Sequence, residues 1–124
     1  MYTSFALLYK EFVARAGPGA RLRGSNFAGT VGANSRITLT LTREGAGVSG
    51  TEQYVRVGKT LWLQGTADSL GNLAIEERYP KDFVTGIFKG ALSQDYRMIS
   101  GFFSKPDGSR LQPFEFREAE ATKP

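Results

Sequence analysis

Residues 35–43 read S-R-I-T-L-T-L-T-R, and this stretch decides the fold class. Ile37, Leu39 and Leu41 alternate with threonines, so the apolar side chains share one face and the hydroxyl groups share the other. Threonine and branched aliphatic residues both suit a pleated surface that is half buried. The stretch therefore predicts a β-strand with one face against a core.

Similar stretches recur along the chain, separated by short turns rich in Gly, Asp, Pro and Ser. Connections this short favour an antiparallel meander, because parallel strands need long crossovers. Eight strands in a meander close most economically into a barrel, which removes the exposed edges. The predicted strands are Phe27–Gly32, Ser35–Arg43, Val48–Val57, Thr60–Ala67, Asn72–Tyr79, Phe83–Leu92, Tyr96–Ser104 and Arg110–Arg117.

Glycines inside the predicted strands support this closure. A strand glycine costs stability, so it usually marks a bend, a bulge or a close approach of two backbones. A small, strongly curved barrel needs such positions, whereas in a two-sheet sandwich some of them are merely bulges. They are Gly50, Gly65, Gly86, Gly90 and Gly101.

Residues 3–16 are predicted to form a short helix that ends at Gly17-Pro18. Its apolar stripe needs a partner, because a helix this short is marginal in water. The stripe contains Phe5, Leu8 and Phe12. We expect an all-β fold, an eight-stranded antiparallel up-and-down barrel with this short N-terminal α-helix. The expected parts are a helix and basic linker (1–23), the barrel (24–118) and a polar C-terminal tail (119–124).

The composition of the 124 residues excludes several kinds of chemistry. The chain has no Cys and no His, so it offers no disulfides, no thiolate and no Ser-His-Asp triad. The whole net charge of +4 lies in residues 1–36, because the cations and anions of residues 37–124 cancel. Nucleic acid and membrane surfaces are therefore not favoured as partners, although residues 10–36 form a local basic segment that an acidic partner could contact. The compartment is left open, cytoplasmic or, if a signal peptide was removed, periplasmic.

The order of glycines and aromatic residues resembles a widespread bacterial group of small lipocalin-like barrels of the calycin type, most of them uncharacterised. The motifs that carry it are G-T-E-Q-Y-V-R-V-G-K-T-L-W-L-Q-G (50–65), G-N-L-A-I-E-E (71–77), T-G-I-F-K-G (85–90), I-S-G-F-F-S-K-P-D-G-S (99–109) and P-F-E-F (113–116). The resemblance implies a lipocalin-like barrel. Because calycins often hold small ligands in the barrel mouth, it also implies a candidate binding cavity.

Strand alternation singles out one carboxylate for the barrel interior. If Leu73 and Ile75 point inward, Glu77 does too, and a carboxylate there is costly unless it is paired. Tyr54 and Arg56 share a face of an earlier strand and are its expected partners. In one interpretation Glu77 is a solvated residue at the rim. In the other, these three polar residues orient a small, partly apolar ligand between the apolar walls Phe88 and Phe103.

Two aromatic residues, Trp62 and Phe102, are predicted to point outward. With the helix stripe they offer a dock for the helix or an interface in a homodimer. The primary prediction is a non-enzymatic binding protein that holds a small, partly apolar ligand in a cavity of the barrel, without metal, cofactor or catalytic residues. Enzyme chemistry by a carboxylate or a tyrosine is disfavoured. The alternative is a protein-interaction module, either an inhibitor or a homo-oligomeric adaptor, that acts through its loops, outward aromatics and helix.

Overall fold

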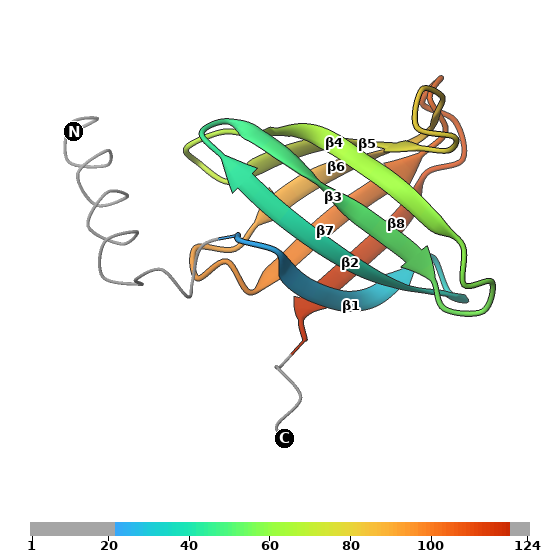
Figure 1. The fold of residues 1–124 in the computed structure, drawn as a ribbon, viewed down its shortest axis with the longest axis horizontal. Helices are drawn as coiled ribbons and strands as arrows, with labels where there is room; N and C mark the ends of the chain where they lie inside the picture. Colours follow the sequence, from blue (N-terminus) through green and yellow to red (C-terminus); the bar gives the residue numbers. More distant parts are fainter. Residues whose placement is uncertain (1–21, 120–124) are drawn as a thin grey trace.

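The computed structural model describes residues 22–119, which form one closed β-barrel (Figure 1). Each strand pairs antiparallel with the next, and β1 pairs with β8 to close the ladder. The predicted eight-stranded up-and-down barrel is therefore confirmed. The strands are β1 (Ser25–Val31), β2 (Ser35–Glu44), β3 (Gly47–Tyr54), β4 (Thr60–Ala67), β5 (Asn72–Arg78), β6 (Val84–Leu92), β7 (Met98–Ser104) and β8 (Gln112–Glu118).

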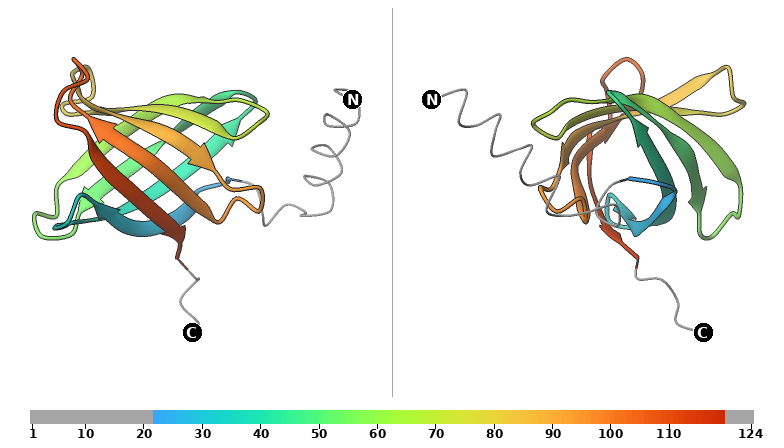
Figure 2. Two further views of the ribbon diagram at one scale, coloured as in Figure 1. Left: turned by 180° about the vertical axis from the view of Figure 1, so that it is seen from behind. Right: turned by 60° about the vertical axis from the view of Figure 1, so that its left-hand side comes forward.

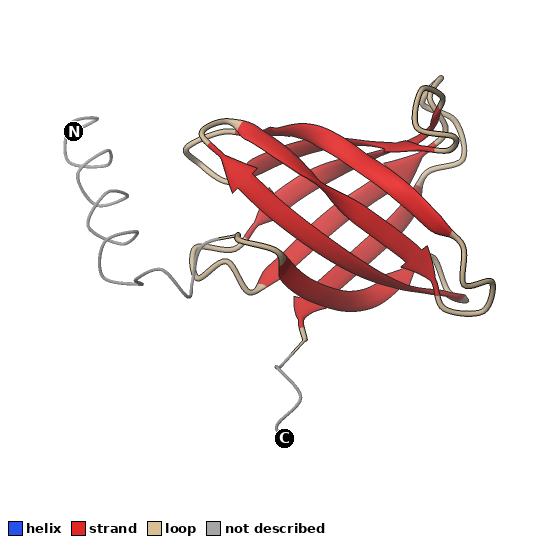
Figure 3. Ribbon diagram, in the orientation of Figure 1, coloured by secondary structure: helices blue, strands red, loops and turns tan. Residues whose placement is uncertain are grey.

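The predicted fold class needs one correction, because residues 22–119 contain no helix and every regular element in them is a strand (Figure 3). The expected helix, residues 3–16, lies outside the described residues. Within residues 22–119 there is accordingly no helix that is long and apolar enough to cross a membrane.

Figure 2 shows the closed, strongly curved barrel from two further sides, and several glycines share the inward face of its strands with buried residues. A Cβ atom on Gly50 would lie 1.8 Å from the carbonyl oxygen of Thr40, and one on Gly65 would lie 2.0 Å from that of Ala74. Both distances are far inside van der Waals contact, so only glycine allows the neighbouring strand to approach this closely. These glycines produce the curvature that closes a barrel of only eight strands.

Apolar side chains fill the interior. The ring of Phe88 lies at the centre, 4.5 Å from that of Phe103, 5.1 Å from that of Phe114 and 5.9 Å from that of Phe116, measured between centroids. The space left among these rings and the surrounding Leu and Ile side chains measures about 10 Å³. That is at most the space of one water molecule, so this part of the core is solid.

The two ends of the barrel differ. We call one end the mouth, at the right in Figure 1; it is formed by the loops 32–34, 55–59, 79–83 and 105–111. The other end, the base, carries the loops 45–46, 68–71 and 93–97. Leu22 and Tyr96 are buried members of the core and close the base. The base is therefore covered by apolar side chains of the core.

Candidate functional site

Two glutamates lie inside the barrel near its mouth. Glu52 on β3 is 1 % exposed and Glu77 on β5 is 4 % exposed. Their places follow from alternation, because Glu52 continues the inward series of Val48 and Glu77 continues that of Ile75. Among residues 22–119 they are the only charged residues that are buried to this degree. The two carboxyl groups therefore form the most unusual polar feature of the interior.

The two carboxyl groups have different surroundings. Tyr54 donates its hydroxyl hydrogen to Oε2 of Glu77 at 3.2 Å, and Thr85 donates its own to Oε1 at 2.8 Å. No hydroxyl or N–H group of the described residues donates a hydrogen bond to either oxygen of Glu52. Glu77 is the group that acts on Glu52, through a side-chain hydrogen bond between the two carboxyl groups and through its charge. Glu52 is thus a buried acid with unused hydrogen-bonding capacity.

Burial, together with the hydrogen bond and the charge of Glu77, raises the pKa of Glu52 from 4.5 to about 10. Burial also raises the pKa of Tyr54, with further contributions from the charges of Glu77 and Glu52. Glu52 therefore holds its proton at neutral pH. The site can accept hydrogen bonds through both glutamates and can release a proton if a cation approaches.

Phe103 stands at the mouth side of the aromatic cluster. Its ring lies over Gly86, so close that a Cβ atom on Gly86 would be 2.2 Å from the ring. Gly86 pairs with Glu77 across β5 and β6, which places Phe103 beside the carboxyl pair. Its side chain is only partly buried, unlike that of Phe88. Of the phenylalanines in the aromatic cluster, Phe103 is therefore the one that reaches solvent and covers the backbone beside Glu77.

The structure brings together four of the five predicted ligand-binding residues, which are Tyr54, Glu77, Phe88 and Phe103. Arg56 instead lies exposed in the loop 55–59. Strand β3 ends at Tyr54, because its carbonyl oxygen accepts hydrogen bonds from the amides of Val57 and Gly58 and closes a turn. Gly58 has a φ of 73°, which glycine adopts without strain.

Glu52 is not among the site residues predicted from the sequence, although its position in the chain carries a signal. It lies two residues before Tyr54, so alternation places both side chains on the same face of β3. Once Tyr54 was assigned to the interior, the same had to hold for Glu52.

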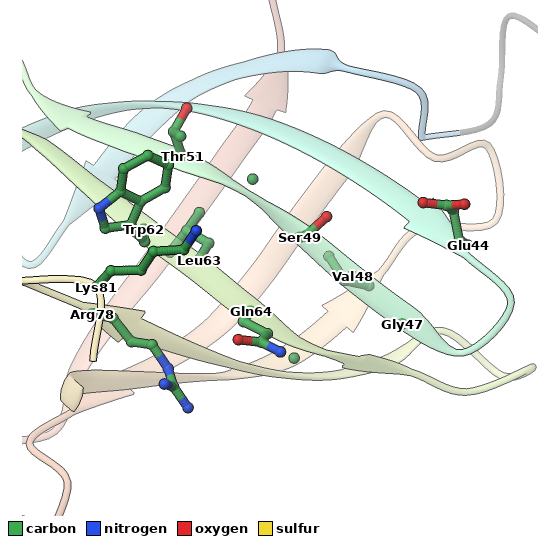
Figure 4. Close-up of a pocket in the computed structure, with 12 residues that line it drawn as sticks. Glu44, Gly47, Val48, Ser49, Thr51, Trp62, Leu63, Gln64, Arg78 and Lys81 are labelled. Carbon is green, nitrogen blue, oxygen red and sulfur yellow. The ribbon is translucent and has the colours of Figure 1, made fainter. Parts of the chain in front are cut away.

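The outer wall carries an open groove of about 500 Å³ across β3, β4 and β5 (Figure 4). Trp62 lines it and is 39 % exposed, with Nζ of Lys81 5.0 Å from its ring centroid. Phe102, on the outside of β7, is 55 % exposed. Both therefore point outward as expected. The helix residues Phe5, Leu8 and Phe12, predicted with them to form a helix dock or a homodimer interface, lie outside the described residues.

Residues 22–119 hold no group of three or more side chains suited to bind a metal ion. No family model matches the chain, and neither the curated proteins nor the solved structures contain a significant match. Beyond the barrel itself, the resemblance to lipocalin-like proteins of bacteria stays a prediction. The function must therefore be argued from the site.

Proposed function

We propose that this chain is a non-enzymatic binding protein for a small, partly apolar molecule whose amino or hydroxyl group reaches the carboxyl pair through the mouth. The observation that carries the proposal is Glu52, which is buried and whose oxygens receive no hydrogen bond from a hydroxyl or N–H group of the described residues. A buried polar group in that state destabilises the fold by about 1–3 kcal/mol. A bound group that donates hydrogen bonds would remove this cost.

The chemistry of the pair selects the polar group of the ligand. An alkylammonium group has three donors and no acceptor, and a hydroxyl group has one donor. Both can use the free oxygens of Glu52, and an ammonium group is also attracted by the charge of Glu77. A carboxylate has only acceptors and carries the same charge as Glu77. The site therefore favours amines and alcohols over acids.

The apolar part of the ligand takes the place of the Phe103 ring. The core below it is solid, and the base is closed by buried side chains, so only the mouth offers a route. Phe103 is partly buried and can turn toward solvent by a change of rotamer. Its departure would expose the face of Phe88 and the backbone of Gly86 beside Glu77.

Three probes with the same tail test the proposal, namely octylamine, octanol and octanoate, titrated calorimetrically at about pH 7. We expect octylamine and octanol to bind, and octanoate to bind at least about tenfold more weakly. Glu52→Leu, which removes both acceptors, should weaken octylamine binding by about tenfold or more.

The matched control is Glu44→Gln, because Glu44 is an exposed glutamate at the end of β2 near the base. It should leave binding unchanged. Equal affinity for the three probes, or unchanged octylamine binding by a folded Glu52→Leu protein, would overturn the proposal. Failure of all three probes to bind would do the same.

A further inference from the structure

The exposed apolar side chains of the barrel gather at the mouth. Eight large hydrophobic residues are exposed in the described part of the chain, and five of them lie in three of the mouth loops. Only one lies in a base loop, Leu70, and the other two are on the outer wall. The five are Val55 (56 % exposed), Val57 (69 %), Tyr79 (39 %), Phe83 (67 %) and Leu111 (66 %).

Positive charge gathers at the same end. The mouth loops carry five cations and two anions, whereas the base loops carry one cation and two anions. The barrel segment that is neutral along the chain is therefore polarised by the fold. The mouth cations are Arg56, Lys59, Lys81, Lys105 and Arg110, and the anions are Asp82 and Asp107.

Cations and apolar side chains alternate within the mouth loops. Arg56 stands between Val55 and Val57, and Arg110 precedes Leu111. The loops 55–59 and 79–83 also contact each other, because Nζ of Lys59 lies 4.2 Å from the ring centroid of Tyr79. A surface that combines exposed apolar side chains with cations suits a bilayer, where apolar side chains enter the acyl boundary and long cationic side chains reach the headgroups.

We propose that the mouth of the barrel docks on a lipid bilayer whose surface carries anionic headgroups. The proposal rests on the loops and does not depend on the ligand suggested above. Charge complementarity selects the occupant, since each Lys or Arg near an anionic surface adds to its attraction. Docking in this direction would also place the entrance to the carboxyl pair against the membrane.

The experiment uses the full chain and sedimentation with two kinds of vesicle, pure phosphatidylcholine and phosphatidylcholine mixed with phosphatidylglycerol at about three to one. We expect binding to the mixed vesicles only, weakening as salt is raised. The double variant Val57→Ser/Phe83→Ser removes two apolar side chains, and Arg56→Gln/Arg110→Gln removes two cations from two loops. Each should weaken binding by about tenfold or more.

Matched controls come from the base, where Leu70→Ser removes an exposed apolar side chain and Arg97→Gln removes a cation. Both should bind like the unchanged protein, and circular dichroism must show all variants folded. No binding to the mixed vesicles overturns the proposal. Binding that survives both double variants does so as well, because another part of the chain then carries it. Binding to soluble polyglutamate but not to vesicles assigns the mouth to an acidic protein instead.

Discussion

The buried carboxyl of Glu52 predicts an unusual pH dependence of stability, which the variant Glu52→Gln should remove. The folded protein holds this proton up to a pKa of about 10, whereas the unfolded chain releases it near 4.5. Between these values the unfolded state binds fewer protons than the folded state. The free energy of unfolding must therefore fall as the pH rises.

The slope is about 1.4 kcal/mol per pH unit for one proton. From about pH 5 to about pH 8 the loss reaches about 4 kcal/mol, a large part of the 5–15 kcal/mol that typically holds a domain together. Glutamine has nearly the shape of the protonated acid but does not titrate. We expect Glu52→Gln to match the unchanged protein at the acidic end and to be more stable by up to about 4 kcal/mol at the alkaline end.

Urea unfolding followed by circular dichroism at several pH values in this range measures the effect. Glu44→Gln serves as the control, because Glu44 is exposed, and it should keep the slope of the unchanged protein. If the unchanged protein and Glu52→Gln show parallel profiles, Glu52 does not hold its proton in the fold, and the description of the site is wrong.

Two further changes test the site and the barrel by urea unfolding. Tyr54→Phe removes the hydrogen bond to Oε2 of Glu77 and should lower the free energy of unfolding by about 1 kcal/mol at neutral pH; an unchanged midpoint would show that the bond contributes nothing. Gly65→Ala forces a Cβ atom against a strand backbone and should cost about 2 kcal/mol or more. Gly47→Ala, whose nearest contact is 3.4 Å, should cost far less, and equal losses would contradict the steric explanation.

Alternation in the sequence predicted the strands and the inward position of Glu77, because a strand with one buried face must repeat every two residues. It did not predict where a strand stops. Val55, Arg56 and Val57 continue the pattern of β3 but form a turn, since main-chain hydrogen bonds to Tyr54 end the strand. Arg56, a predicted partner of Glu77, therefore lies in a loop instead of the strand. Glu52, which does interact with Glu77, was not predicted.

The separation of charge between the two ends of the barrel could not be predicted from the order of residues along the chain. Cations and anions cancel over residues 37–124, so the sequence indicates a neutral barrel. An up-and-down meander sends alternate turns to opposite ends. Charges that are neighbours along the chain are thereby separated in space, and only the topology shows which turns meet.

The pairing of β1 with β8 determines from which end of the barrel a fusion partner or a surface tether would start. Ser25 begins β1 and Glu118 ends β8 at the base, where the amide of Ala119 bonds to the carbonyl of Asn26. Both ends of the barrel segment thus leave from the side opposite the mouth (Figure 1). A fusion partner or a surface tether joined at either end of this segment starts at the base, which leaves all four mouth loops facing outward.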